Sequence, residues 1–149
     1  MKVFIASDHA GFTKKQELAS GLEKDFEIYD MGPYKLDPDD DYPLYAKKLA
    51  LAVQENPGSM GLLLCASGEG MAIAANKIAG IRAATVANVA AAKHTRRDND
   101  SNVLSLAAGD LSSRELKEIS LAWLNEPFSE LERHKRRIEE ITQLEKEAL

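Results

Sequence analysis

Short apolar runs alternate along the chain with longer stretches in which apolar residues recur at every third or fourth position. The first pattern is typical of buried strands and the second of amphipathic helices. We predict strands over residues 3–6, 26–29, 61–65, 81–86 and 103–106. We predict helices over residues 12–24, 42–54, 89–98, 112–124 and 129–148, and a small-residue helix that follows the turn 66–70 and ends near Gly80. Ser112 and Glu115 have the spacing of a capping box.

The alternation of strands and helices predicts an α/β fold. We expect one doubly wound, Rossmann-like sheet of five parallel strands, with helices on both faces and an extended C-terminal helix. Residues 1–149 contain no fixed-period repeat and no linker-like stretch, which indicates a single domain. Ligands of such sheets bind beyond the carboxyl ends of the strands, where the strand order reverses. The candidate loops are those after Ala6, Tyr29, Cys65, Val86 and Leu106.

The composition is that of a soluble globular protein, with 44% apolar and 29% charged residues. The net charge of −5 argues against a general nucleic-acid-binding protein, because surfaces that follow phosphates are usually basic. No 18 apolar residues run together, and the apolar start MKVFIA is too short for a signal-peptide core. The single cysteine excludes an internal disulfide and suits a reducing compartment. We expect a cytoplasmic protein with no membrane partner.

The stretch LLLCASGEGMAIAANK, residues 62–77, places that cysteine at the predicted carboxyl end of the third strand. Gly68 and Gly70 permit positive φ angles and let backbone N–H groups converge, as a cradle for a phosphate or a developing oxyanion requires. The alternative is that Cys65 is a small buried hydrophobic residue beside an ordinary glycine-containing turn.

Familiar cofactor and metal motifs do not fit. The glycines are not followed by lysine and then serine or threonine, which excludes a P-loop. A dinucleotide fingerprint needs a third glycine where Ile73 stands and an acidic residue where Asn88 follows the next strand. The three histidines, at positions 9, 94 and 134, lack the spacing of a zinc site. We expect neither a cofactor nor a metal.

Asp8 and His9 follow the first strand, at the same predicted sheet edge as Cys65. An adjacent acid and imidazole can move a proton between them. The alternative is a helix cap in a surface turn, which is the commoner use of such a pair.

The segment ERHKRRIEE, residues 132–140, is a basic cluster in an acidic protein. On a helix, Arg133 and Arg137 lie one turn apart, where two guanidinium groups repel unless an anion lies between them. This spacing indicates a phosphate clamp. The alternative is a solvated face on which Glu132, Glu139 and Glu140 neutralise part of the charge.

The motifs SDHAGF, DDDYP, CASGEGMAIAANKIAGIRA, NDSNVL and RHKRRI, in this order, resemble the ribose-5-phosphate isomerase type B and galactose-6-phosphate isomerase family. The resemblance spans nearly the whole chain. It implies a metal-free aldose–ketose isomerase that binds a sugar phosphate. It also implies a homodimer, which pairs into a tetramer in some members, with active sites at the subunit interface.

The resemblance implies a role for Cys65 as the base that takes the proton from C2 and returns it to C1 through a cis-enediolate. Ser67 corresponds to a residue that hydrogen-bonds the sugar and relays protons. The oxyanion is stabilised by the amides of residues 68–71, which are Gly68, Glu69, Gly70 and Met71.

The resemblance also implies the groups that hold the substrate. Asp8 and Tyr42 correspond to residues that contact sugar hydroxyl groups near the reacting centre, and Asn99 corresponds to an asparagine that hydrogen-bonds the substrate. The phosphate is bound by His9, Arg133 and Arg137, with His134 beside them.

Two positions depart from the family pattern. Asp98 stands where the ribose-5-phosphate branch has a histidine credited with opening the furanose ring, and Gly109 replaces an arginine that helps to hold phosphate. Our hypothesis is that Asp98, or His94 one turn earlier, takes the proton from the anomeric hydroxyl, which carboxylates can do.

We therefore expect an isomerase of the pentose phosphate pathway that interconverts D-ribose 5-phosphate and D-ribulose 5-phosphate. One alternative is the same chemistry on a hexose 6-phosphate such as galactose or allose 6-phosphate. The other is a sugar-phosphate-binding protein without catalysis.

Overall fold

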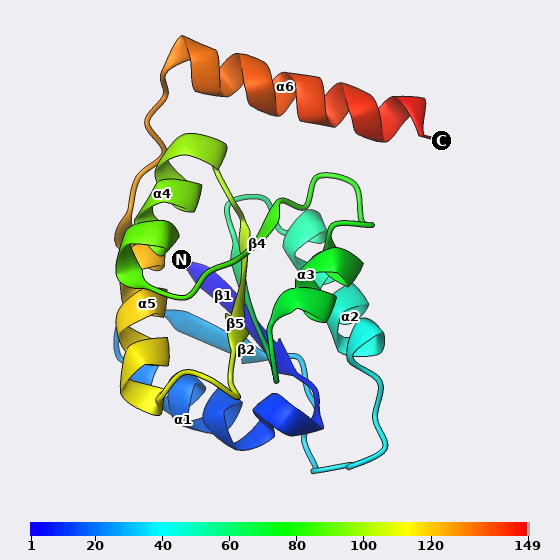
Figure 1. Ribbon diagram of the computed structural model, residues 1–149, viewed down its shortest axis with the longest axis vertical. Coiled ribbons are helices and arrows are strands. Elements are labelled where there is room, and N and C mark those ends of the chain that lie inside the picture. The colour runs from blue at the N-terminus through cyan, green and yellow to red at the C-terminus, as the bar shows by residue number, and fades with distance from the viewer. Residues whose placement is uncertain (149) are drawn as a thin grey trace.

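The computed structural model describes residues 1–148, within which five parallel strands form one sheet in the order β2-β1-β3-β5-β4 (Figure 1). The strands are β1 (Lys2–Ser7), β2 (Glu27–Asp30), β3 (Met60–Cys65), β4 (Ala83–Thr85) and β5 (Val103–Ala107). Because β1 leads outward to β2 while the chain then crosses back to β3, the strand order reverses between β1 and β3. The predicted doubly wound α/β fold is confirmed.

Helices cover both faces of the sheet. One face packs against α1 (Phe12–Leu22), α4 (Val89–Asn99) and α5 (Ser113–Asn125), and the other packs against α2 (Tyr42–Glu55) and α3 (Glu69–Ala75). The last helix, α6 (Glu132–Glu147), lies across one end of the molecule and contacts α4 (Figure 1). None of the helices in residues 1–148 has the length and apolar character needed to cross a bilayer.

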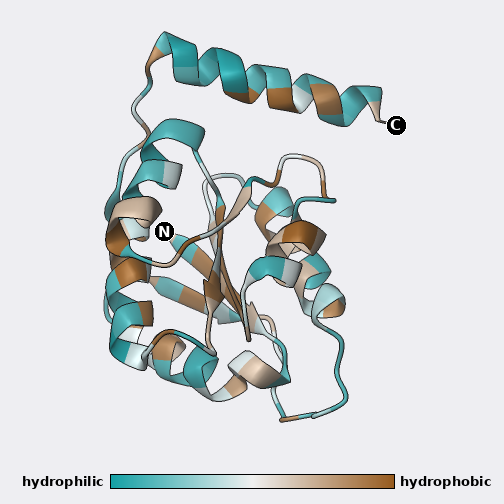
Figure 2. Ribbon diagram, in the orientation of Figure 1, coloured by the Kyte–Doolittle hydropathy of each residue, from teal (hydrophilic) through white to brown (hydrophobic). Residues whose placement is uncertain are grey.

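The central strand β3 is buried along its whole length. Its side chains alternate, so that Leu64 joins the core beneath α1 and α5 while Leu63 joins the core beneath α2. In Figure 2 hydrophobic residues are concentrated on the strands, and hydrophilic residues cover much of the surrounding helices. Full burial of each such leucine stabilises the fold by about 1.5–3 kcal/mol. A nearly continuous apolar run is thus what a two-sided parallel strand requires.

Two predicted boundaries were wrong by three or more residues. The helix after Cys65 ends at Ala75 instead of near Gly80, because the Asn76 side chain accepts the Ala83 N–H at 2.7 Å and donates to the Ala83 carbonyl at 2.9 Å. β4 is also shorter than the predicted strand 81–86, by two residues at its start and one at its end. The last helix begins at Glu132 instead of 129, because Glu130 has a φ of 57°, which a helix cannot accommodate.

The remaining elements agree with the prediction to within two residues at either end. The predicted capping box is confirmed: Ser112 Oγ accepts the Glu115 N–H at 3.2 Å, and the Glu115 carboxylate accepts the Ser112 N–H at 2.8 Å.

Candidate functional site

Two loops leave the sheet together at the point where the strand order reverses. β1 and β3 pair in register up to Ser7 and Leu64, and the Asp8 N–H continues the pairing by donating to the Leu64 carbonyl at 3.3 Å. Asp8 therefore lies beside the stretch that begins with Cys65. This edge is where doubly wound sheets bind their ligands.

Asp8 is buried and caps the short 3-10 helix η1 (His9–Gly11). Its Oδ1 accepts the Gly11 N–H at 3.1 Å. The helix-cap alternative is therefore observed, and so is the position at the sheet edge that a site residue requires. Since Oδ1 serves the cap, Oδ2 is the oxygen through which Asp8 can meet a ligand.

Cys65 ends β3 on the side of α2 and α3, and only 5% of the residue is exposed. Gly68 has a φ of 78° and turns the chain so that its N–H donates to Cys65 Sγ at 3.1 Å. An N–H donor in this position stabilises negative charge on the sulfur. Burial agrees with the hydrophobic alternative, but the donor gives the sulfur a polar partner that packing does not require.

The carbonyl of Gly68 is held by two hydroxyl groups that sequence reasoning missed. Ser105 Oγ donates to it at 2.5 Å from β5, and Thr85 Oγ1 donates at 3.3 Å from β4. Ser105 is fully buried, although it lies within the apolar run VLSLA. A polar residue inside an otherwise apolar strand was the available signal, because a buried hydroxyl needs a partner.

The rest of the turn presents backbone and one hydroxyl group to the sheet edge. Ser67 is exposed, and its Oγ accepts the Glu69 N–H at 3.3 Å. Gly70 packs directly under Tyr42, since a Cβ at Gly70 would lie 2.7 Å from Tyr42 Cζ. Met71 is fully buried in the core, so only its backbone can serve a ligand.

His9 is held from the loop between β2 and α2 by Asp40, another residue that sequence reasoning missed. Asp40 Oδ1 accepts the His9 backbone N–H at 3.0 Å and lies 2.7 Å from His9 Nδ1. This contact raises the pKa of His9 above its ordinary value, and the charge of Asp8 adds to the effect. The acidic loop sequence was the only signal, and it does not say which of its aspartates turns inward.

A second group of candidates lines a cavity of about 490 Å³ at the end of β4, between α4 and α6. His94, Asp98 and Asn99 come from α4, and His134 and Arg137 come from α6. Neither Cys65 nor any residue of the turn 66–71 lines this cavity. Within one copy of the chain, the two groups of predicted residues therefore do not line this cavity together. Thr85, which lines the cavity and donates to the Gly68 carbonyl, connects them.

The titratable side chains of this second group act on one another. A hydrogen bond from Arg97 Nε to Asp98, at 3.0 Å, holds the pKa of that carboxyl below its usual value, with smaller contributions from His134 and His94. His134 is buried, and its Nδ1 lies 2.7 Å from Ser129 Oγ. Asp98 is thus a carboxylate at neutral pH. Across residues 1–148, no three or more His, Cys, Asp or Glu side chains are grouped so as to hold a metal ion.

Arg133 and Arg137 are both exposed on α6. Lys135 and Arg136, which lie between them, form ion pairs with glutamates at 3.0 Å and 3.9 Å. In the part of the chain that the structure describes, no carboxylate forms an ion pair with Arg133 or Arg137. The neutralised-face alternative therefore applies to their neighbours, and the two predicted clamp residues keep their charge available.

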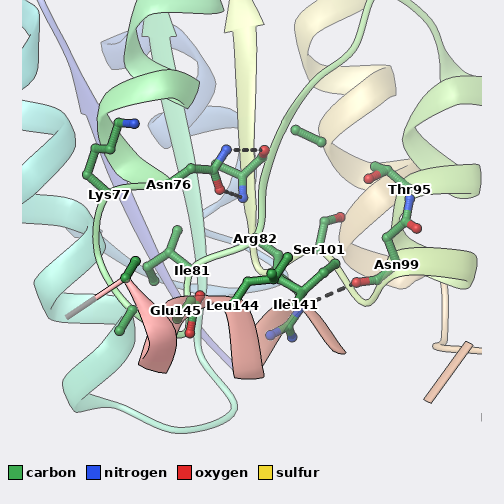
Figure 3. Close-up of a pocket in the computed structure, with 14 residues that line it drawn as sticks. Asn76, Lys77, Ile81, Arg82, Thr95, Asn99, Ser101, Ile141, Leu144 and Glu145 are labelled. Atoms are coloured by element: carbon green, nitrogen blue, oxygen red, sulfur yellow. Dashed lines mark hydrogen bonds between the residues drawn. The ribbon is translucent and has the colours of Figure 1, made fainter. Parts of the chain in front are cut away.

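A larger cavity, of about 670 Å³, lies beneath α6 (Figure 3). Ile81, Ile141 and Leu144 line it together with polar residues such as Arg82. Asn99 lines both this cavity and the smaller one. No other predicted site residue lines the larger cavity, which the sequence did not indicate.

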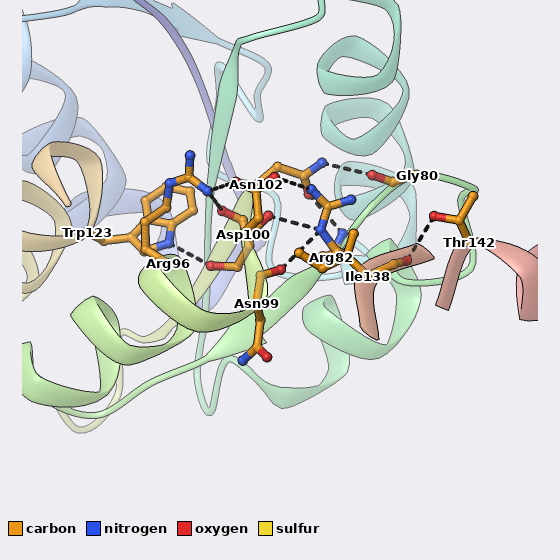
Figure 4. A network of polar contacts seen from close by, with 10 residues as sticks. Gly80, Arg82, Arg96, Asn99, Asp100, Asn102, Trp123, Ile138 and Thr142 are labelled. Atoms are coloured by element: carbon orange, nitrogen blue, oxygen red, sulfur yellow. Dashed lines mark hydrogen bonds and ion pairs between the residues drawn. The ribbon is translucent and has the colours of Figure 1, made fainter. Parts of the chain in front are cut away.

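The motif that contains Asn99 mainly holds the structure together (Figure 4). Asp100 ends α4 with a φ of 48° and forms ion pairs with Arg82, at 3.0 Å, and with Arg96. Asn102 Oδ1 accepts the Arg82 N–H at 2.8 Å. These contacts tie the end of α4 to β4, so Asn99 is the residue of the motif that is left to face a ligand.

The loop after β5 has no room for a side chain at Gly109. Its N–H donates to the Ala66 carbonyl at 2.9 Å, and a Cβ there would lie 2.9 Å from that oxygen. Lys14 Nζ donates to the carbonyls of Ala108 and Leu111 at 2.5 Å and 2.6 Å. The loop thus lies closely against the strand end that carries Cys65, which explains the glycine.

Comparison with known proteins gives one consistent result. Residues 3–141 match the family described as Ribose/Galactose Isomerase. The chain is 39% identical over 145 residues to ribose-5-phosphate isomerase B of Escherichia coli, covering 97% of this chain and 96% of that protein. It is 40% identical over 146 residues to the probable ribose-5-phosphate isomerase B of Mycoplasma pneumoniae, and this match covers 97% of this chain and 95% of that protein.

A solved structure gives the same result. The structure matches the crystal structure of ribose-5-phosphate isomerase B from Mycoplasma genitalium with bound ribulose-5-phosphate. The TM-score between the two chains is 0.94, and their sequences are 38% identical. The match covers 98% of this chain and 97% of that one.

Proposed function

Because the chain belongs to the ribose/galactose isomerase family, we propose that it interconverts D-ribose 5-phosphate and D-ribulose 5-phosphate without a cofactor. The observation that carries the proposal is Cys65, a lone thiol at the carboxyl end of β3 that receives the Gly68 N–H at 3.1 Å. The relatives named above, and the neighbour with ribulose-5-phosphate bound, support this choice of sugar.

Cys65 is the base of the proposed mechanism. Its thiolate takes the proton from C2, and the electron pair of that bond forms the enediolate while charge develops on the oxygen at C1. The amides of residues 68–71 stabilise this charge, because preorganised N–H donors act most strongly where charge develops. The same thiol returns the proton to C1, and Ser67 carries the hydroxyl proton between the two oxygens.

Ring opening precedes this step, since the furanose has no free carbonyl group. We propose that Asp98 or His94 accepts the proton of the anomeric hydroxyl. Asp98 can accept this proton because it is ionised at neutral pH, while the hydrogen bond from Arg97, which lowers its pKa, makes it a weaker base. The Asp98→Ala and His94→Ala variants should separate the two, with turnover falling about a hundredfold for the residue that acts. If both variants turn over normally, neither residue opens the ring.

The phosphate group is assigned to His9, Arg133 and Arg137, with His134 beside them. Arginine forks bind phosphate through paired hydrogen bonds, and these two arginines have no competing carboxylate among the described residues. Since the two groups of site residues lie apart within one chain, we propose a homodimer in which one subunit brings its second group to the first group of the other.

The decisive experiment is an assay of ketose formation from five-carbon and six-carbon aldose phosphates, measured side by side. Ribose 5-phosphate should give the highest kcat/KM. Preference for galactose or allose 6-phosphate would favour the hexose alternative. Binding of every sugar without turnover would identify a catalytically silent protein.

The Cys65→Ala variant tests the assigned base. Turnover should fall by about 10⁴-fold or more, because the proton-transfer group is removed, while affinity for a sugar phosphate changes little. Retention of turnover in this variant would refute the assigned role. Circular dichroism compares the fold of the variant with that of the wild type.

A further inference from the structure

The loop between β2 and α2 brings Asp40 next to His9, which lies 31 positions earlier in the chain. Its Oδ1 contacts His9 twice, at the backbone N–H (3.0 Å) and at ring Nδ1 (2.7 Å). The exposure of the two side chains is unequal: 5% for the carboxylate and 42% for the imidazole. The acid is therefore the anchored member of the pair, and the ring is the member presented to solvent.

The burial of Asp40 has a cost that its contacts with His9 only partly offset. Its second oxygen, Oδ2, is buried and forms no hydrogen bond of ordinary geometry within residues 1–148, although the Tyr45 hydroxyl, whose pKa is raised first by burial, is near enough for Asp40 to raise that pKa further. An unsatisfied buried oxygen destabilises a fold. The neighbouring acidic residues Asp37, Asp39 and Asp41 remain exposed. The inward position of this one aspartate thus calls for a role, and the hydrogen bonds that it accepts come from His9.

The contact determines which ring nitrogen faces a ligand. A nitrogen 2.7 Å from a carboxylate carries the proton, so Nδ1 donates to Asp40 and Nε2 is left for another group. In neutral imidazole Nε2 would then only accept a hydrogen bond, and an unprotonated phosphate oxygen has no proton to donate to it. In the imidazolium ion Nε2 also donates, and phosphate is bound.

We propose that Asp40 is a positioning residue: it holds His9 by Nδ1 and keeps the ring in the form that donates from Nε2 to a phosphate group. The assignment of phosphate to His9 rests on the function proposed above. The contact between Asp40 and His9 rests on the geometry alone.

The segment 40–42 also contacts the turn that follows Cys65. Two residues after Asp40, Tyr42 begins α2 and packs over Gly70 in the turn that follows Cys65. The segment 40–42 therefore bridges the two loops that flank the reversal of strand order. A phosphate at His9 and a sugar at the Cys65 turn would be held at a separation that this segment sets.

The negative charges near His9 act on its pKa in one direction. The charged groups that act on the His9 ring are Asp40, from the loop, and Asp8, from the end of β1, and both raise the pKa of His9. The hydrogen bond that the ring donates to Asp40 is the largest cause of this rise. A raised pKa means that the imidazolium form persists to higher pH, and phosphate affinity falls as the pH rises through that value. Removal of the Asp40 charge moves this fall to lower pH.

Asp40→Asn tests the proposal, with Asp39→Asn as the matched control on the same loop. In the full-length protein labelled with ¹⁵N-histidine, the tautomer and pKa of His9 are measured by NMR, and His9→Gln assigns the signal. In Asp40→Asn the His9 pKa should fall, and the Nδ1–H tautomer of the neutral ring should no longer be more populated than the Nε2–H tautomer. Asp39→Asn should match the wild type, and Asp40→Glu should restore part of the shift.

The kinetic readout is the KM for ribose 5-phosphate as a function of pH. In Asp40→Asn, KM should rise about tenfold above neutral pH, as loss of a charge-assisted contact implies, and should approach the wild-type value in acid. The kcat should change by less than about threefold. A tautomer and pKa of His9 that Asp40→Asn leaves unchanged, or a KM raised equally at every pH, would overturn the proposal.

The two proposals fail separately. If the wild-type protein turns over no sugar phosphate, the proposed function is wrong, and the NMR titration with inorganic phosphate still decides the role of Asp40. A phosphate-dependent shift of the His9 signal that weakens in Asp40→Asn supports the positioning role. An equal shift in both proteins contradicts it.

Discussion

Ser105 shows how a residue that need not touch a ligand can control a candidate site. Its hydroxyl group donates to the Gly68 carbonyl at 2.5 Å, and the same residue, Gly68, donates its N–H to Cys65 Sγ at 3.1 Å. The hydroxyl therefore fixes the turn that supplies the sulfur with its donor. This buried hydrogen bond is also a stabilising contact, since without it the carbonyl keeps only its two longer contacts, with Thr85 Oγ1 and the Ala72 N–H, both at 3.3 Å.

We expect Ser105→Ala to lower the free energy of unfolding by about 0.5–1.5 kcal/mol, because the buried carbonyl loses its nearest donor and keeps two longer ones. The kcat should fall as the turn loosens. Urea denaturation and steady-state kinetics measure the two effects. Ser120→Ala is the control, since Ser120 is equally buried but its hydroxyl has no partner among the described residues. Equal effects of the two substitutions would contradict this view of Ser105.

At the scale of elements, α4 carries three of the candidate residues and depends on both of its ends. Asn88 Oδ1 accepts the Ala91 N–H at 2.8 Å at the N-terminus, and Asp100 ends the helix in the left-handed region with Arg82 and Arg96 paired to it. The sequence pattern predicted the helix, but it did not identify these caps. A helix N-cap typically contributes about 1 kcal/mol to the free energy of unfolding.

The Asn88→Ala variant should reduce the free energy of unfolding by about 1 kcal/mol, since the first turn of α4 loses its cap. Thermal denaturation gives the value. Asn88→Asp retains an acceptor oxygen and should lie close to the wild type. A melting temperature that falls equally in both variants would show that the cap is not the reason.

At the scale of the whole molecule, the separation of the two residue groups is the main feature. The Cys65 group lies at the reversal of strand order, whereas Arg137 and its neighbours line a cavity between α4 and α6. A two-fold dimer presents the same two surfaces twice, so each contact between the groups occurs in both directions. The proposed shared site follows from this symmetry.

Mixed dimers test the shared site. Cys65→Ala and Arg137→Ala are each expected to be inactive or strongly impaired, and unfolding and refolding them together should restore activity. Random pairing makes half of the dimers mixed, each with one intact site, so about a quarter of the wild-type activity should return.

The control for this experiment pairs two variants of the same group. A mixture of Cys65→Ala and Asp8→Ala should regain nothing, because no arrangement of those chains produces an intact site. Failure of the first mixture to regain activity would place Cys65 and Arg137 in a site supplied by one subunit.

The sequence by itself determined the order and type of the elements. Apolar runs and helical periods depend on neighbours along the chain, so β3, α5 and the capping box at Ser112 were predicted correctly. The position of Cys65 at a strand end also followed, because the run that buries β3 stops there. Boundaries were missed where a distant group decides them, as Ala83 does for the end of α3 through Asn76.

Only the tertiary structure decided which polar groups meet. Asp40 reaches His9 across 31 residues and Ser105 reaches Gly68 across 37, and no local pattern records either contact. The reason is physical: a hydrogen bond is satisfied by whichever group the fold brings within about 3 Å, whereas strands and helices are specified by the side chains next to them in the chain.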